Sequence, residues 1–408
     1  MRLAHVSDWH LGITTYRQER RSDLEEVLDQ TVECCMEFAP DLVLHTGDLF
    51  HHVRPALDDI RLACETLRRL AELAPVVVIC GNHESPAQLR FLDEFVFPGD
   101  RVRFIDVPRR PEDGGVLEYE LRDGGERVRL ASIPFIPAER MVEVFEDPRT
   151  WMTDYADRVR RIQEALDAGL RAGFDPRRDV LLFAAHLHVT GAQVTHSERP
   201  LHVSDSYAAH AEALPKVSYA AFGHIHKAQR LPGTQLGWYA GSPIALDFGE
   251  EHDVKVMLLV EAEPGRPAQL TEHTYSISRP LRRLHGSLAE LDALDDPGRA
   301  LCLVTVVTEE PTDSLADTLQ ARWPEATLLD VVEDCTARRV AVLSSGDGPA
   351  AVEAERPIDE LFADYIAEVG TEQATVTEAL RAFRILQAAV EADEHPEFPE
   401  LDAIGDTA

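Results

Sequence analysis

Five short clusters of His, Asp and Asn side chains constrain this chain of 408 residues more than any other feature. Each cluster comes directly after an apolar run of the kind that forms a buried strand. In chain order the clusters are Asp8-Trp9-His10, Gly47-Asp48, Gly81-Asn82-His83-Glu84, a lone His186 and Gly223-His224-Ile225-His226. We expect all five to project from the same end of a sheet, where they can hold two metal ions.

Taken one at a time, the clusters have ordinary structural explanations. Asp8 can be a surface carboxylate beside a structural histidine, and Asp48 can be a helix cap or a turn residue. The segment 81–84 can be a simple turn, and His186 a hydrogen-bonded histidine at a strand end. The pattern His224-x-His226 after a strand is a stronger metal signal. The joint occurrence of five strand-terminal clusters outweighs the separate explanations, and mixed Asp, His and Asn ligands favour Mn, Fe or Zn over Mg or Ca.

The apolar pattern predicts an α/β fold. Over residues 1–106 short strands alternate with helices, which predicts a mostly parallel sheet. A turn signal at 123–125 predicts a hairpin, and strands that dominate 217–275 are expected to form a second layer. The expected helices lie at about 20–38, 57–73, 87–95 and 150–172. We therefore expect a two-layered β-sandwich core flanked by helices.

The pattern changes after Pro280 to strand, helix, strand, helix and strand, ending near Leu343. The predicted divisions are a core domain over 1–278, a small α/β domain over 279–345, a linker over 346–356, a helical segment over 357–392 and an acidic disordered tail over 393–408. The helical segment has amphipathic patterns that suit either a partner or packing on its own domain.

Charge limits the classes of partner. The formal net charge is -33, which argues against binding nucleic acid through a basic surface, so phosphate chemistry would depend on bound cations or a basic partner. Lys occurs three times among 40 basic residues. This preference for Arg suits bidentate phosphate contacts, although a GC-rich genome is the simpler explanation.

The cysteine pattern and the start of the sequence predict the cellular location. Six cysteines show no C-x-x-C spacing, so we expect small buried hydrophobes in a reduced, cytoplasmic protein. The sequence from Met1 to Val6 lacks a signal-peptide pattern, and no apolar run reaches the roughly 18 residues of a membrane span. We expect no membrane association.

Longer motifs around the clusters resemble the SbcD family, the nuclease subunits of a bacterial repair complex within the calcineurin-like metallophosphoesterase superfamily. The matching segments are Ser7-Asp8-Trp9-His10-Leu11-Gly12, Gly47-Asp48-Leu49-Phe50, Gly223-His224-Ile225-His226-Lys227-Ala228-Gln229 and Gly241-Ser242-Pro243-Ile244. They lie within the first 250 residues, and the later module resembles that family's capping domain, which would orient DNA over the metals.

The resemblance implies a role for each site residue. Asp8, His10 and His226 would bind a first metal, Asn82, His186 and His224 would bind a second, and Asp48 would bridge both. His83 would act on the transition state or protonate the leaving oxygen, and His51 would contact a phosphate. The implied cofactor is two Mn²⁺ ions, with Asp48 and His83 as catalytic residues.

The implied reaction is Mn-dependent hydrolysis of DNA, by 3′-to-5′ exonuclease action on double strands and endonuclease action on single strands. The implied partners are DNA ends, hairpins and single strands, an SbcC ATPase gripped by residues 357–390, and a second copy within a heterotetramer. Two alternatives stay open. A phosphoesterase for small molecules or phosphoproteins would share all five clusters, and a non-catalytic subunit that tethers DNA ends would need metals only for its fold.

The remaining histidines near the clusters have simpler expected roles. His188, His196, His202 and His210 lie in the loop after the fourth cluster and are expected to be solvated. His45 and His52 flank the second cluster and are expected to pack or cap locally.

Overall fold

The computed structural model describes residues 1–121, 125–137, 148–195, 197–198, 208–233 and 236–337, together with Phe383, and of residues 148–156 it describes the backbone alone. The chain divides into a compact unit, Met1–Asp334, and a second unit that begins at Cys335. The expected linker, helical segment and tail lie outside the described residues, apart from Phe383, so they stay predictions.

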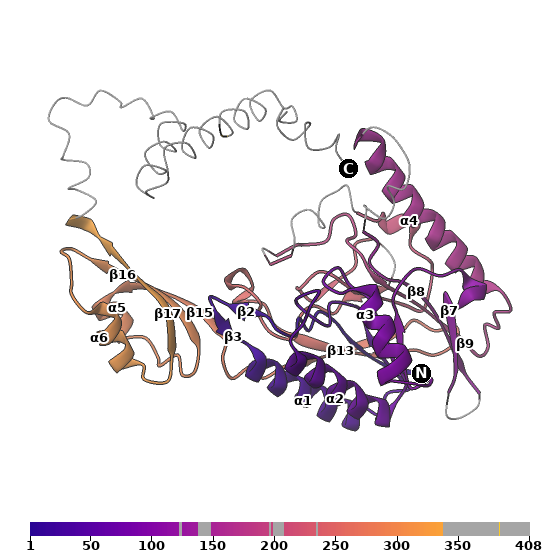
Figure 1. The fold of residues 1–408 in the computed structure, drawn as a ribbon, viewed down its shortest axis with the longest axis horizontal. Coiled ribbons are helices and arrows are strands. Elements are labelled where there is room, and N and C mark those ends of the chain that lie inside the picture. The colour runs from indigo at the N-terminus through magenta and orange to yellow at the C-terminus, as the bar shows by residue number, and fades with distance from the viewer. Residues whose placement is uncertain are drawn as a thin grey trace, which may run out of the picture. The chain divides into compact units, whose positions relative to one another are not determined.

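The first sheet has six strands in the order β14-β13-β1-β4-β5-β6. Figure 1 labels its strand β13. Its parallel part consists of β1 (Arg2–Val6), β4 (Leu42–His45), β5 (Val76–Ile79) and β6 (Val102–Ile105). The helices that follow these strands are α1 (Arg21–Phe38), α2 (Leu57–Leu73) and α3 (Pro86–Phe91), the last continued by a π-helical turn, η1 (Leu92–Val96). The expected parallel layer over 1–106 is confirmed.

The second sheet also has six strands, in the order β11-β12-β10-β9-β8-β7. They are β7 (Val116–Glu120), β8 (Arg127–Ile133), β9 (Asp179–His186), β10 (Tyr219–Gly223), β11 (Gln229–Arg230) and β12 (Gly237–Tyr239). Helix α4 (Pro148–Arg171) packs on this sheet through side chains that include Leu166 and Leu170. Leu42 and Val77 of the first sheet share a core with Leu182 and Tyr219 of the second, which makes the two sheets a sandwich.

One part of the expected layering is wrong. The strands β13 (Val256–Glu261) and β14 (Gln269–Thr274) belong to the first sheet, although we expected all strands in 217–275 to form the second. Strand β13 pairs antiparallel with β1, with Leu259 opposite Ala4. The pairing covers a strand edge that would otherwise present unpaired backbone groups.

The third sheet carries the strand and helix alternation expected after Pro280. It comprises β15 (Leu281–Ser287), α5 (Leu288–Asp292), β16 (Leu301–Thr308), α6 (Leu315–Arg322) and β17 (Thr327–Cys335). A separate apolar cluster around the fully buried Trp323 holds this small module together. The expected end near Leu343 lies outside the described residues, so the domain limits of 279–345 stay a prediction.

Two further expectations concern the whole chain. All six cysteines are free and buried, as predicted for small hydrophobic side chains. Among the described residues, no helix combines the length and the apolar character that crossing a bilayer requires.

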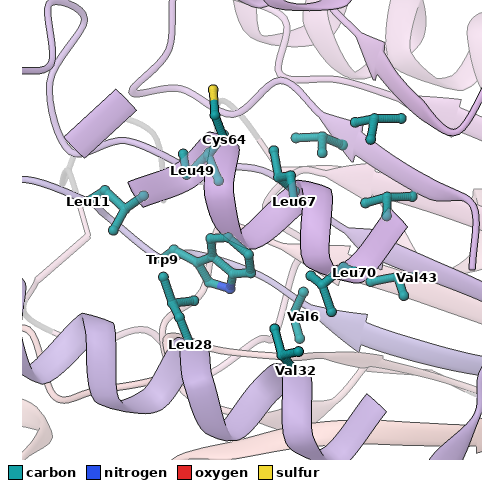
Figure 2. Packing of buried hydrophobic residues seen from close by; sticks show 14 of the residues in the cluster. Val6, Trp9, Leu11, Leu28, Val32, Val43, Leu49, Cys64, Leu67 and Leu70 are labelled. Atoms are coloured by element: carbon teal, nitrogen blue, oxygen red, sulfur yellow. The ribbon is translucent and has the colours of Figure 1, made fainter. Parts of the chain in front are cut away.

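Trp9 fixes the loop that follows β1. Its side chain is fully buried against α1 and α2, among Leu28, Leu67 and Leu70 (Figure 2). Burying a side chain of this size contributes about 4–6 kcal/mol, an upper estimate. The indole therefore anchors the short segment that carries Asp8 and His10.

Candidate metal centre

The five clusters come from two sheets. Three follow β1, β4 and β5 of the first sheet, and two lie at the ends of β9 and β10 of the second. The carboxyl ends of the two sheets meet, because the Asp8 carboxylate accepts the backbone N–H of His224 at 3.1 Å. The expectation of one sheet end is therefore wrong in this detail, although the clusters do converge.

The loops that carry Asp8, His10 and Asp48 pair with each other through their backbones. Asp8 N–H donates to the Gly47 carbonyl at 2.9 Å, and His10 N–H donates to the Asp48 carbonyl at 3.0 Å. All three non-glycine residues have positive φ, at 50°, 48° and 54°. A left-handed conformation costs such residues about 1–2 kcal/mol each, and it persists only where surrounding contacts fix it.

Two glycines in the motifs allow the loops to approach closely. A Cβ on Gly47, where φ is +108°, would lie 2.2 Å from His186 Nδ1. A Cβ on Gly81 would lie 2.1 Å from Asp48 Oδ1 and 2.4 Å from its backbone nitrogen. Any larger residue at either position would push the site residues apart.

The first group of donors comprises Asp8, His10, Asp48 and His226, whose potential ligand atoms all lie within 4.8 Å of one another. The Nε2 atoms of His10 and His226 are 3.1 Å apart. Two nitrogens bound to one metal at about 2.0–2.1 Å are separated by roughly 2.8–3.4 Å for angles between 90° and 109°. The spacing therefore fits two imidazoles that share an ion.

The second group contains Asp48, His186 and His224, with Asn82 beside them. His186 Nε2 and His224 Nδ1 are 3.2 Å apart. Asn82 Oδ1 lies 2.9 Å from the first of these nitrogens and 2.8 Å from the second. Four donor residues, each from a different strand end, thus lie together beside the first group.

Asp48 is the residue that the two groups share. Its Oδ1 accepts the backbone N–H of His83 at 2.9 Å. Its Oδ2 is buried, lies 3.6 Å from His10 Nε2 and 3.4 Å from His186 Nε2, and accepts no hydrogen bond from a described residue. A buried acceptor left unsatisfied costs about 1–3 kcal/mol, whereas a cation on each side would satisfy it. The donor set and this orphaned oxygen fit a two-metal site.

Neighbouring side chains shift the pKa values of Asp48 and His186. Burial raises the pKa of Asp48, but His186, His83 and His10 outweigh burial and hold the pKa well below its usual range. Burial lowers the pKa of His186, yet Asp48 outweighs it and raises that pKa to about 9. The pair therefore holds a proton at neutral pH that a divalent cation has to displace before His186 can bind it.

Hydrogen bonds on the far side of two imidazoles decide which nitrogen faces the site. His186 Nδ1–H donates to the Thr46 carbonyl at 2.8 Å, so Nε2 is the nitrogen that would bind a metal once its proton is displaced. His226 Nδ1 lies 2.5 Å from Ser197 Oγ and 3.4 Å from Glu250 Oε1, so its Nε2 is turned toward His10. Both contacts bring in residues that sequence patterns did not identify.

Glu84 is another functional residue without a predicted role. Its buried carboxylate accepts N–H groups from Gly81 at 2.6 Å and from Phe50 at 3.0 Å, which joins the loops after β4 and β5. Burial raises the pKa of Glu84 to about 8. Its position in the fourth place of the segment 81–84 was the available signal.

His83 and His51 lie beside His10. His83 Nδ1–H donates to the His51 carbonyl at 2.7 Å, which orients the imidazole ring. The His10 and His83 rings have centroids 4.7 Å apart, and His51 Nδ1 lies 3.3 Å from His10 Nδ1. These imidazoles form a group with potential ligand atoms within 4.8 Å, so the predicted catalytic residues adjoin the predicted metal ligands.

The remaining histidines near the clusters differ in burial. His45 is buried against Trp9, with ring centroids 4.7 Å apart, and accepts the Gly47 N–H, so local packing is confirmed. His52 is exposed and its ring contacts His51 edge-on, so it packs locally as expected. His188 is buried, so its expected solvation is wrong, whereas His210 is exposed as expected. His196 and His202 lie outside the described residues.

Comparisons with known proteins agree with this geometry. Residues 1–228 match the calcineurin-like phosphoesterase family. The SbcD subunit of the SbcCD nuclease from Bacillus subtilis strain 168 is 30% identical over 308 residues, 73% of this chain and 76% of that protein. Its counterpart in Escherichia coli K12 is 27% identical over 72% of this chain and 73% of that protein. A solved dimetal phosphatase from Danio rerio has 13% identity and a TM-score of 0.43 over 67% of this chain and 96% of that one, a likeness too weak to add to the assignment. The chain belongs to the calcineurin-like phosphoesterase family, as a homologue of its SbcD nucleases.

Proposed function

We propose that this protein is a Mn²⁺-dependent DNA nuclease, with 3′-to-5′ double-strand exonuclease and single-strand endonuclease activities used in DNA end processing and repair. The observation that carries the proposal is the buried Asp48 carboxylate between two donor groups. The mixed Asp, His and Asn donors suit manganese better than magnesium or calcium. The similarity to SbcD nucleases supports DNA as the class of substrate.

In this proposal Asp8, His10 and His226 hold one metal, Asn82, His186 and His224 hold the other, and Asp48 bridges them. When bound, the two cations activate the attacking water and stabilise charge on the phosphoryl oxygens. His51 contacts a phosphate oxygen from the rim of the site. His83 acts on the transition state or protonates the leaving oxygen, with its ring oriented by the His51 carbonyl and its backbone by Asp48.

A hairpin next to the site supports a polymeric substrate. Strands β2 (Thr14–Thr15) and β3 (Gln18–Glu19) are joined by Tyr16 and Arg17, which are exposed and have φ of 49° and 65°. Non-glycine residues seldom adopt this turn. Arg17 forms no ion pair with a described residue. An exposed cation on this hairpin cannot contact a small phosphate ester bound at the metals, whereas it can contact the phosphate backbone of a nucleic acid.

Arg17 is within reach of DNA held at the metal centre. Ile13 N–H donates to the His10 carbonyl at 3.0 Å, and Arg17 follows four residues later, so the Cα atoms of Ile13 and Arg17 are at most about 13 Å apart. This limit corresponds to at most about four base-pair steps along the axis of a duplex. The guanidinium can therefore contact a phosphate several nucleotides from the scissile bond.

Replacing Arg17 with Glu is expected to lower the rate on duplex DNA about tenfold at moderate salt, because a phosphate contact becomes a repulsion. Hydrolysis of bis(p-nitrophenyl) phosphate, which is too small to reach Arg17, should fall much less. The matched control is Arg266→Glu, at the exposed turn between β13 and β14. Since β13 runs antiparallel to β1, this turn lies at the opposite end of the sheet from the site. Equal losses on DNA for both variants would contradict the role of Arg17.

The proposed partners are DNA, an SbcC ATPase that binds residues 357–390, and a second copy of the chain. Phe91 and Phe95 support the second copy: their rings stack with centroids 5.3 Å apart while 55% and 69% of each residue remains exposed. On α2, Leu57 is 84% exposed. Exposed aromatic pairs of this kind are typical of protein interfaces.

Incubation of the purified chain with linear duplex, hairpin and single-stranded DNA, with Mn²⁺ or with chelator, tests the proposal. We expect Mn²⁺-dependent loss of nucleotides from 3′ ends and cleavage within single strands. Intact DNA together with rapid hydrolysis of small phosphate esters would favour a small-molecule or phosphoprotein phosphoesterase. Intact DNA that is nevertheless bound and held end to end would favour a tethering subunit.

A further inference from the structure

A buried ion pair lies directly behind His226. Lys255 Nζ donates to Glu250 Oε2 at 2.5 Å and to the His226 carbonyl at 3.1 Å. Glu250 is fully buried, and its other oxygen faces His226 Nδ1 at 3.4 Å. Ser197 Oγ bonds to both His226 and Glu250. The position of Glu250 therefore decides where the His226 imidazole is held.

Glu250 belongs to a single 3-10 turn, η6 (Phe248–Glu250). The small third sheet contacts this turn through β15 and β16. Arg283, on β15, donates from Nη1 to the Phe248 carbonyl at 2.9 Å, and its backbone N–H donates to Glu251 at 2.8 Å. The Arg283 guanidinium also lies over the Phe248 ring, 5.3 Å from its centroid. Phe248 in turn shares an apolar cluster with Leu281 and Leu301 of β15 and β16.

We propose that η6 couples the small module of β15–β17 to the first metal site, with Glu250 as the positioning residue for His226. The inference rests on the metal-binding role proposed for His226. When nucleic acid or a partner binds the module and displaces β15, η6 shifts as well. The hydrogen-bonded imidazole of His226 then moves with η6. The module then adjusts metal affinity without contacting the metal.

The geometry makes η6 a stiff connection. Only Gly249 separates Phe248 from Glu250, and Asp247 caps the turn by accepting the Gly249 N–H at 2.8 Å. Phe248 is 1% exposed and Lys255 is 3% exposed, so neither end has room to move independently. Close-packed interiors transmit such displacements because they have few voids to absorb them.

Glu250→Gln tests the positioning role. Measured by calorimetric titration with Mn²⁺, one of two sites should weaken by about 10- to 100-fold, as is usual when the partner of a ligand histidine is lost. The double variant Glu250→Gln, Lys255→Met removes the lysine charge that the single change leaves unpaired, and it should show the same weakening with the native circular-dichroism spectrum. Wild-type affinity at both sites in a folded variant would overturn the proposal.

Arg283→Ala tests the coupling, with Arg282→Ala as the matched control on the neighbouring exposed position of β15. Arg283→Ala should weaken the same Mn²⁺ site by about two- to thirtyfold, whereas Arg282→Ala should not change it. Combined with Glu250→Gln, Arg283→Ala should cause no further loss, because both act through His226. Arg283→Ala that matches Arg282→Ala, or a loss that simply adds to that of Glu250→Gln, would overturn the coupling.

These titrations need no nuclease activity. If the wild-type chain binds two Mn²⁺ ions and leaves DNA intact, the proposed function fails while the coupling can still be measured. If DNA is degraded and the Arg283 variant binds Mn²⁺ as the wild type does, the function stands and the coupling is refuted.

Discussion

The Asp48→Asn variant is expected to hydrolyse DNA at least about 1000-fold more slowly than the wild type in Mn²⁺. Asn keeps the size of the side chain and can keep the hydrogen bond from His83 N–H. It removes the negative charge between the two donor groups, however, and can place an NH₂ group where His10 and His186 each approach Oδ2. The centre should therefore bind fewer than two ions, which elemental analysis would measure beside the digestion rate. Asp48→Ala should lose activity as completely.

Asp106 offers a matched control for this change. It follows strand β6 as Asp48 follows β4, and it is equally buried, but its carboxylate pairs with Arg90 and Arg109. Burial raises the pKa of Asp106, and the two guanidinium groups outweigh it and lower the pKa overall. Asp106→Asn should reduce the melting temperature and leave the rate per folded molecule nearly unchanged. Asp48→Asn with a rate within tenfold of wild type would contradict the two-metal assignment.

The fold could be predicted where the local apolar pattern of a segment reflects its burial in the folded protein. The run Val76–Ile79 is apolar at every position because the strand is buried on both faces between helices and the second sheet, and a continuous apolar run of this kind is visible in the sequence. The assignment of β13 and β14 to a layer could not be predicted in the same way. Their alternation fits either sheet, and the free edge of β1 decides the question through a contact across more than 250 residues.

Some residues of the candidate site could likewise be predicted from the sequence, and others could not. Its clusters were visible because each needs a strand before it and a particular residue type, as with Gly47-Asp48. Glu250 and Lys255 gave no such signal, because an acid and a lysine five residues apart are common on surfaces. Their burial as a pair depends on His226 and Ser242, which other loops supply. Local sequence identifies the ligands, whereas the residues that orient them appear only in three dimensions.

The His83→Gln variant is expected to lose activity on DNA by about 100- to 10,000-fold, the range of general acid catalysis. In DNA the leaving group is a poorly stabilised alkoxide, which needs a proton as the ester bond breaks. His83 is suited to supply it, because its Nδ1–H is held by the His51 carbonyl and its ring lies against that of His10, with centroids 4.7 Å apart.

The leaving group separates the two roles open to His83. p-Nitrophenolate is stable without a proton, so hydrolysis of p-nitrophenyl thymidine phosphate by His83→Gln should fall less than about tenfold if the imidazole is the acid. Similar losses on DNA and on the activated ester would instead assign His83 to stabilising charge on the phosphoryl oxygens. His51→Gln is the control: a phosphate contact affects both substrates alike, because it does not depend on the group that departs. The ratio of the two rates for each variant therefore distinguishes proton transfer from charge stabilisation, even though the two imidazoles are neighbours.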